Sequence, residues 1–369
     1  MDISRAGVPL GIPGTSGWEE HSRGKEAGTC RHVVWSNRQC RPIQQRRDFV
    51  PVVTVSIMEI EFDVIAEGLF FPEGPLVLPD GSVVVVEVGG GVLTRIDPTD
   101  GSKQTVARPG GGPNGAAVGP DGALYVCNNG GLAFKDGTDG HFPSGQAADY
   151  SGGRIERIDL DSGTTEVIFR ESNGHPLKGP NDIVFDASGG FWFTDHPKKR
   201  DRDRDWGGVH YVAADYASIT EVRHKLDDPN GIGLSPDGST LYVADTRAAR
   251  LWSWPVLAPG VLAGDESTFM GVRGRGATCI ATLPRFQSFD SLAVEAGGHV
   301  VVATIAEPAG LTVVDPVTGG YVLTELPDPI PTNVCFGGDD MQTAYATLSS
   351  RGLLVRMRWP RPGLRLNFQ

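Results

Sequence analysis

The chain has 369 residues, of which 50 are glycine and 27 are proline, and its formal net charge is −12. Glycine and proline at this density break helices and argue against a mostly helical protein, although a hydrophobic content of 39% is enough to build a core. The acidic balance argues against a nucleic-acid partner, and the lack of an apolar run approaching about 20 residues argues against a membrane-spanning segment.

Residues 1–57 differ in composition from the rest of the chain. They carry 8 Lys and Arg against 5 Asp and Glu, whereas the remainder carries 25 against 40. They show the period of neither a strand nor a helix, and they lack the apolar segment of a secretory signal. We expect residues 1–57 to be an unstructured N-terminal extension, best explained by translation upstream of a natural start at Met58, and residues 58–369 to form the folded domain.

The cysteine pattern bears on the compartment. The chain has five cysteines at wide spacing, with no Cys-x-x-Cys pair, and they are Cys30, Cys40, Cys127, Cys279 and Cys335. An odd number at such spacing is typical of reduced thiols and indicates a cytoplasmic protein rather than a disulfide framework. The last three fall in or beside apolar segments, so we expect them to be inert core thiols.

One sequence unit recurs six times. It consists of a short polar segment, three or four apolar residues, a turn such as Pro-Asp-Gly and a second apolar run, and it begins at Phe71, Gly112, Gly179, Asp228, Ser288 and Pro331. Asp-Gly and Gly-Gly favour tight hairpin turns, and the Val-, Phe- and Tyr-rich runs have the length of strands. With the strands that follow, each unit predicts a four-stranded antiparallel sheet. Six such sheets predict an all-β fold, a six-bladed β-propeller around a central channel that holds a metal.

Other segments predict how the ring closes and what covers it. The strand at 61–68 precedes the first unit, so we expect it to complete the last blade beside the strand at 353–360. Insertions at 134–152 and 198–208 are expected to follow blades 2 and 3 and to overhang the channel mouth. The charged run 198–205 is interpreted as solvated surface. Asp195 and Asp245 end the second apolar run of their units and are expected to form hydrogen bonds at a blade corner.

Each unit carries one oxygen-bearing side chain just before its innermost strand. These anchor residues are Glu73, Asn114, Asn181, Asn230, Asp290 and Asn333. Propeller geometry would bring them to one end of the channel, where two carboxylates and four amides would be costly without a partner. Carboxylate and amide oxygens suit hard divalent cations, and the lack of histidine and cysteine argues against a zinc-type site. We expect one divalent cation, Ca²⁺ first, with Mg²⁺, Mn²⁺ or Zn²⁺ as alternatives.

Four motifs in order, one per blade, carry a resemblance to a known family. They are FPEGP, GPNDIVFD, PNGIGLSPDGSTLYVADT and FDSLAVEAGG. Over residues 60–357 the chain resembles the SMP-30/gluconolactonase/luciferin-regenerating-enzyme (LRE) family, in which a divalent cation in the propeller tunnel activates a lactone or related ester. The resemblance implies Glu73, Asn230 and Asp290 as metal ligands and Asp290 as the acid/base residue. It also implies that Asn181 contacts the substrate or acts as a further metal ligand.

The chain departs from the family pattern at two places. Many members have Asp-Gly where this chain has Asp290-Ser291, and a lactonase subgroup of drug-responsive proteins shares Asp-Ser, which favours a bacterial lactonase. The basic residue that many sugar lactonases carry two positions before Asn181 is here Gly179, which puts recognition of a sugar hydroxyl array in doubt. We expect Ser291 and His196 to join Asn181 in substrate binding, with His196 at the pocket mouth as a proton shuttle.

The predicted function is divalent-metal-dependent hydrolysis of a sugar lactone or another small lactone, a gluconolactonase-like activity. The cation would polarise the carbonyl, and Asp290 would act as general acid and base. Two alternatives stay open: a phosphotriesterase acting on organophosphates with the same oxygen-rich site, and a propeller that binds a ligand without turnover. The expected partner is a small-molecule lactone, with no nucleic acid and no membrane, and a closed ring that needs no second subunit favours a monomer.

Overall fold

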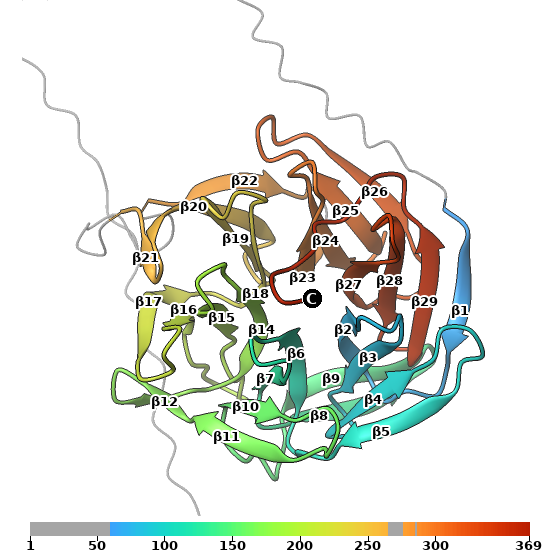
Figure 1. The fold of residues 1–369 in the computed structure, drawn as a ribbon, viewed down its shortest axis with the longest axis horizontal. Helices are drawn as coiled ribbons and strands as arrows, with labels where there is room; N and C mark the ends of the chain where they lie inside the picture. The colour runs from blue at the N-terminus through green and yellow to red at the C-terminus, as the bar shows by residue number, and fades with distance from the viewer. Residues whose placement is uncertain (1–59, 265–275, 285) are drawn as a thin grey trace, which may run out of the picture. The chain divides into compact units, whose positions relative to one another are not determined.

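The computed structural model describes residues 60–264, 276–284 and 286–369, and the predicted extension at 1–57 lies outside them. The described chain is built from strands and turns, and none of its segments is a helix. Accordingly, no helix within it is long and apolar enough to cross a membrane. The blade strands form six antiparallel sheets, five of four strands and one of five, that stand around a central axis as the blades of a propeller (Figure 1).

The first three blades follow one another along the chain. Blade 1 consists of β2 (Pro72–Val77), β3 (Val83–Glu87), β4 (Val92–Ile96) and β5 (Lys103–Ala107). Blade 2 consists of β6 (Pro113–Val118), β7 (Leu124–Asn128), β10 (Arg154–Ile158) and β11 (Thr165–Phe169). Blade 3 consists of β14 (Pro180–Phe185), β15 (Phe191–Asp195), β16 (Gly207–Val212) and β17 (Ile219–Leu226). Two hairpins are added to them, β8 (Leu132–Gly137) with β9 (Gly140–Gln146), and β12 (Glu171–Ser172) with β13 (His175–Pro176).

The other three blades complete the ring. Blade 4 consists of β18 (Pro229–Leu234), β19 (Thr240–Asp245), β20 (Arg250–Ala258) and β22 (Thr278–Thr282), with β21 (Val261–Leu262) paired to the end of β20. Blade 5 consists of β23 (Ser288–Val294), β24 (Val300–Ile305), β25 (Gly310–Val314) and β26 (Tyr321–Glu325). Blade 6 consists of β27 (Pro331–Gly337), β28 (Thr343–Leu348), β29 (Leu353–Arg358) and β1 (Phe62–Ala66).

The ring closes through blade 6, in which the first strand of the described chain pairs with the last. Phe62 lies opposite Met357 and Val64 opposite Val355 in an antiparallel register. This confirms the prediction that the strand at 61–68 completes the last blade. The pairing covers the outer edge of β29, which would otherwise present unpaired backbone groups.

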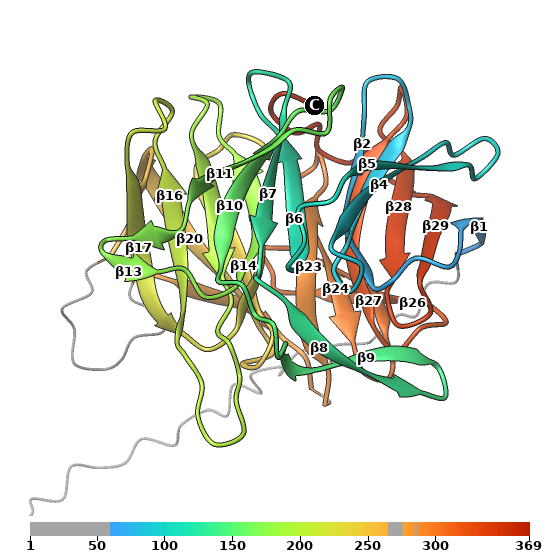
Figure 2. The ribbon, with the colours of Figure 1, turned by 90° about the horizontal axis from the view of Figure 1, so that it is seen from below.

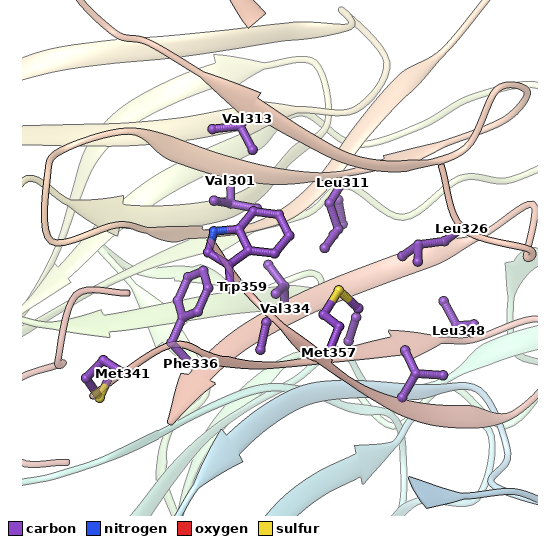
Figure 3. Packing of buried hydrophobic residues seen from close by; sticks show 14 residues of the cluster. Val301, Leu311, Val313, Leu326, Val334, Phe336, Met341, Leu348, Met357 and Trp359 are labelled. Carbon is purple, nitrogen blue, oxygen red and sulfur yellow. The ribbon is translucent and has the colours of Figure 1, made fainter. Parts of the chain in front are cut away.

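The hydrophobic core lies between neighbouring blades and not in one central mass. At the contact of blades 5 and 6, Val301 and Leu311 pack against Phe336, Met357 and Trp359 (Figure 3). Since β-sheets pack through their faces, each blade buries apolar residues against both neighbours. The innermost strands β2, β14 and β18 are buried along their whole length, including the polar residues near their starts.

One end of the central channel is closed by the C-terminal segment. Asn367 Nδ2 donates to the Phe185 carbonyl at 2.9 Å, and Gln369 Nε2 donates to the Val77 and Phe336 carbonyls at 3.3 Å. These carbonyls belong to the last part of the innermost strands, so the C-terminal end of those strands is the closed side. Figure 1 places the C-terminus at the centre of the ring. The anchor residues lie at the opposite, N-terminal end of the strands.

The two predicted insertions lie inside blades and not after them, which corrects the sequence prediction. The β8–β9 hairpin lies between β7 and β10 of blade 2, and the segment 196–206 lies between β15 and β16 of blade 3. The hairpin extends across the end opposite to the C-terminus (Figure 2). His141 N donates to the Ser350 carbonyl at 2.9 Å, and Ser350 Oγ donates to the Asp139 carbonyl at 3.1 Å, so the hairpin tip connects blade 2 to blade 6.

The charged run 198–205 is only partly solvated, which also differs from the prediction. The Lys198 residue is 3% exposed, and Arg204 forms ion pairs of 2.8 Å with both Asp227 and Asp228. Lys199 pairs with the second oxygen of Asp228 at 2.6 Å. These contacts attach the segment to the start of blade 4. Its basic residues therefore stabilise the fold, although some of them are also exposed to solvent.

Candidate active site

The anchor residues lie at the start of the innermost strands, where each strand has an irregular register. The first paired residues of β2, β6, β14, β18 and β23 are followed by a β-bulge or register shift at the anchor position. A bulge turns side chains away from the alternating pattern of a regular strand and re-aims them. The six side chains are buried, and five of them line the pocket at the open end of the channel, which we call the mouth pocket: Glu73, Asn114, Asn181, Asn230 and Asp290.

Glycines that follow the anchor residues bring neighbouring blades together. A Cβ on Gly115 would lie 2.5 Å from the Asn181 carbonyl oxygen, and a Cβ on Gly231 would lie 2.8 Å from the Asp290 carbonyl oxygen. Gly74 makes the same close approach to the next blade. Only a residue without a side chain permits this spacing, so these glycines hold the anchor backbones of adjacent blades in contact.

A polar residue at the end of the second strand fixes the approach to the anchor in four blades. Glu87, Asn128, Asp195 and Asp245 each accept a hydrogen bond from a backbone N–H two or three residues before the anchor. Asp195 accepts three such bonds of 2.6–3.0 Å, and burial raises its pKa to about 7. The expected blade-corner hydrogen bonds of Asp195 and Asp245 are confirmed.

Glu73 is held by blade 6 and by its own strand. Its Oε2 accepts hydrogen bonds from Asn333 Nδ2 at 2.9 Å and from Gly74 N at 2.8 Å. Among the described residues, no hydrogen bond goes to Oε1. Burial first, and then the carboxylates of Asp290 and Asp182, raise the pKa of Glu73 well above its usual range. Asn333, the sixth anchor residue, therefore orients Glu73 and does not line the mouth pocket.

Asn230, Asp290 and Ser291 form one polar group across blades 4 and 5. Ser291 Oγ donates to Asn230 Oδ1 at 3.2 Å, and Asn230 Nδ2 donates to Thr246 Oγ1 at 3.1 Å. Burial raises the pKa of Asp290 to about 7, while a hydrogen bond with the Asn230 side chain opposes that shift. The Ser291 hydroxyl is therefore engaged with its neighbours, and its expected role in substrate binding stays a prediction.

The Asn181 side chain has an unsatisfied oxygen. Asn181 Oδ1 is buried and has no hydrogen-bond partner in the described part of the chain. The backbone carbonyl of the same residue accepts a 3.4 Å bond from Asn114 Nδ2. A buried amide oxygen without a partner loses the free energy of a hydrogen bond, so its presence at the mouth pocket favours a ligand there.

Asp182 is a buried carboxylate that the sequence did not single out, and it lines the channel cavity on the side of the C-terminal segment. It is 7% exposed, its Oδ1 accepts a 2.9 Å bond from Ile183 N, and burial raises its pKa to about 7. Its charge raises the pKa of both Glu73 and Asp290, so it belongs to the same electrostatic group. A signal existed in the sequence, because a carboxylate stands here in an apolar strand where the corresponding residue of three other units is glycine.

His196 also lines the mouth pocket, and its buried surroundings favour the uncharged ring at neutral pH. Its Nδ1 lies 3.3 Å from the Pro229 carbonyl oxygen, and burial lowers its pKa to about 4. Part of the remaining wall is apolar and comes from Phe71, Leu132, Phe142, Pro143, Ile305 and Ile330. Lys135, Lys198 and Lys199 add basic side chains to the wall. The mouth pocket therefore combines an acidic and amide floor with walls that are partly apolar and partly basic.

The donor set decides which cation could be held. In the described ranges no group of three or more His, Cys, Asp or Glu side chains makes a metal cluster by itself. A cation at this end of the channel would have to draw on amide oxygens as well as on carboxylates. The set consists of oxygen donors from different blades, which is the chemistry that Ca²⁺ and Mg²⁺ take from proteins.

The fold and site define a six-bladed propeller with buried carboxylates and amides at the open end of its channel. The model of the SMP-30/gluconolactonase/LRE-like region matches residues 71–350. The chain belongs to this family, as its motifs led us to expect.

Relatives with names that describe an activity occur among curated proteins. The chain is 32% identical over 246 residues to "Lactonase drp35" of Staphylococcus saprophyticus, covering 65% of this chain and 68% of that protein. It is 34% identical over 186 residues to the protein of the same name from Staphylococcus aureus strain bovine RF122, covering 50% of this chain and 49% of that protein. The matches thus span 68% and 49% of these two relatives.

Solved structures confirm the fold. A gluconolactonase from Xanthomonas campestris superposes with a TM-score of 0.64 at 20% identity, covering 84% of this chain and 93% of that one. A calcium-binding protein, regucalcin, from Agrobacterium tumefaciens superposes with a TM-score of 0.62 at 20% identity, covering 84% and 99%. At this level of identity the likeness concerns the six-bladed architecture.

Proposed function

We propose that the protein is a divalent-cation-dependent hydrolase that opens small lactones at the mouth pocket. The observation that carries the proposal is the convergence of Glu73, Asn230 and Asp290 from three blades beside the unbonded Asn181 Oδ1. The relatives named lactonase support the reaction class.

The residues at the site fit a hard cation. Glu73, Asn230 and Asp290 would supply two carboxylates and one amide oxygen, and the charges of the carboxylates would balance a 2+ ion. Asn181 Oδ1 would gain the partner that it lacks in the described chain. Ca²⁺ is the first candidate because its coordination accepts mixed carboxylate and amide oxygens. When bound, the cation would polarise the lactone carbonyl and stabilise negative charge on its oxygen.

The chain's own residues would carry the proton and place the substrate. Asp290 accepts a proton from the water whose oxygen attacks the carbonyl carbon, and it returns that proton to the ring oxygen as the acyl–oxygen bond breaks. His196 is neutral and offers a ring nitrogen to a polar group of the substrate. The apolar walls hold the carbon skeleton of the ring and exclude bulk water. The products are a hydroxyl group and a carboxylate on one molecule.

Metal analysis and kinetics on the purified full-length chain test this function. We expect one equivalent of a divalent cation, and we expect hydrolysis across a panel of γ- and δ-lactones to stop with chelator and return with Ca²⁺. Asp290→Asn should lower kcat at least about 100-fold, as loss of a general acid/base does. The matched control is Asp161→Asn, at an exposed carboxylate on an outer turn of blade 2.

Three results would overturn the proposal. The first is lactone hydrolysis at an unchanged rate in chelator, which removes the cation. The second is full activity of Asp290→Asn, which removes the acid/base residue. The third is turnover of a phosphotriester with no lactone in the panel hydrolysed, which replaces the reaction class.

A further inference from the structure

Three lysines line the mouth pocket, and their ammonium groups differ in solvent exposure and in ion-pair partners. Lys135 is exposed on β8 of the hairpin, and Lys199 is exposed and pairs with Asp228 at 2.6 Å. Lys198 is 3% exposed. A buried ammonium group normally has a carboxylate partner, because removing it from water costs several kcal/mol. The groups that surround the Lys198 ammonium therefore indicate which kind of ligand the pocket would bind.

The neighbours of the Lys198 ammonium are uncharged. Nζ donates to the Gly131 carbonyl at 3.1 Å and to Asn129 Oδ1 at 3.3 Å, and it lies 5.1 Å from the centroid of the Tyr150 ring. Among the described residues it forms no ion pair. Burial lowers the pKa of Lys198 to about 7, and the carboxylates of Asp195 and Asp205 oppose this shift through space.

The backbone holds this lysine in place. The Lys198 carbonyl accepts a 3.1 Å hydrogen bond from Asp205 N, and the Lys199–Arg204 bridge closes the same small loop. The side chain passes over Gly179, where an added Cβ would lie only 3.3 Å from Lys198 Cε. The absence of a side chain at Gly179 therefore leaves room for a lysine that enters from the next loop. Such a fixed position reduces the entropy lost when a ligand binds.

We propose that Lys198 is a specificity residue that binds an anionic substituent of the substrate, so that the preferred substrates are lactones bearing a carboxylate. This inference rests on the proposed function, because it names the substrate class of the same pocket. A carboxylate beside Lys198 would supply the ion-pair partner that the described residues do not provide. The lactone carbonyl of the same molecule would then face the floor, which consists of carboxylates and amides. In the reverse orientation, without a cation, the floor carboxylates would repel the carboxylate of the ligand.

The test compares matched ligands that differ only in charge. Binding of tetrahydrofuran-2-carboxylate and of tetrahydrofuran-2-carboxamide, neither of which can be hydrolysed as a lactone, is measured by calorimetry on the full chain loaded with Ca²⁺. Hydrolysis is measured on 5-oxotetrahydrofuran-2-carboxylate and on its carboxamide. The variants are Lys198→Met, which keeps the length and removes the charge, Lys198→Arg, which keeps the charge, and Lys103→Met, which removes an exposed charge on the outer strand of blade 1.

We expect the wild-type protein to bind the carboxylate more tightly than the carboxamide. Lys198→Met should lose about 10- to 100-fold in affinity for the carboxylate, the usual effect of a charged hydrogen bond, with little change for the carboxamide. The loss in hydrolysis should appear in KM and not in kcat, and Lys198→Arg should restore part of it. Lys103→Met should behave like the wild type.

Three results would overturn the inference. The first is equal binding of the two ligands by the wild-type protein, which is informative even if Lys198→Met does not fold. The second is an equal loss for both ligands in Lys198→Met, the result expected of a purely structural lysine. The third is an unchanged affinity of Lys198→Met for the carboxylate, the result expected of a carboxylate that binds only the cation. If the carboxylate binds through Lys198 but no lactone is hydrolysed, the proposed function fails and the anion site stands.

Discussion

Gly231 allows the sharpest test of how the site is assembled. In Gly231→Ala, the new Cβ would lie 2.6 Å from Leu292 N, 2.7 Å from the Ser291 carbonyl carbon and 2.8 Å from the Asp290 carbonyl oxygen. Ordinary contacts begin near 3.4 Å, so blades 4 and 5 must separate locally by roughly 0.6–0.8 Å. All three contacts are with backbone, which cannot turn aside as a flexible side chain can. Overpacking of this kind costs about 1–3 kcal/mol of stability.

The same displacement should also reduce activity. It moves Asp290 relative to Asn230, and a misplacement approaching 1 Å costs about 100-fold in rate, so we expect kcat/KM for lactones to fall about 10- to 100-fold. Urea denaturation measures the first effect, and lactone kinetics with saturating Ca²⁺ measure the second. The matched control is Gly297→Ala in the first hairpin turn of blade 5, where the nearest atom to the new Cβ is 4.0 Å away.

The control should stay within about 0.5 kcal/mol of the wild type with unchanged kinetics. Wild-type kcat/KM in Gly231→Ala would show that the close approach of the two strands does not position the site. A similar loss of activity in both variants would show that the effect is not specific to the contact between blades 4 and 5.

Three further predictions concern other parts of the molecule. Glu73→Gln should abolish the rise in melting temperature that Ca²⁺ causes in the wild type. Its circular dichroism spectrum in chelator should match that of the wild type. A rise as large as in the wild type would show that Glu73 is not a ligand of the cation. Arg154→Met should lower the free energy of unfolding by about 3–5 kcal/mol, because it leaves the Glu156 carboxylate buried without the partner that lies at 2.5 Å; a loss below 1 kcal/mol by urea denaturation would contradict this. Iodoacetamide should label the exposed Cys279 in the native protein and leave the buried Cys127 unmodified by peptide mapping, and equal labelling would show that blade 2 opens.

The sequence predicted the inner half of each blade because that half repeats. A polar anchor, an apolar strand, a Gly-rich turn and a second apolar strand recur in every unit, since every blade must bury the same faces against two neighbours. The outer strands are less regular because one face meets solvent, as the exposed residues of β5 and β11 show. The insertions were therefore assigned to the gaps between blades, whereas they lie between the second and third strands.

The alternation of residues along a strand predicts side-chain burial poorly where contacts between distant parts of the chain determine that burial. Asp182 follows Asn181, and in a regular strand two consecutive side chains point to opposite faces. The bulge at the start of β14 lies at these two residues. Asn181 lines the mouth pocket, whereas Asp182 lines the channel cavity on the side of the C-terminal segment and acts on the site through its charge. Cys279 was expected to be a core thiol, but it lies on the outermost strand of blade 4 and is exposed. Strand periodicity does not report how far from the axis a strand lies.

Lys198 shows why the floor of the pocket was predictable and its wall was not. Each floor residue is fixed by its place in a repeat, so six equivalent positions converge whatever the loops do. The wall depends on a loop of blade 3 attached to Asp228 of blade 4 and on a side chain that fills the space over Gly179. In sequence, Lys198 is one of several charges in a polar run, and only folding brings it to the wall facing the anchor residues. If the floor sets the reaction and the wall sets the substrate, members of this family can change specificity through such loops while the anchor residues stay unchanged.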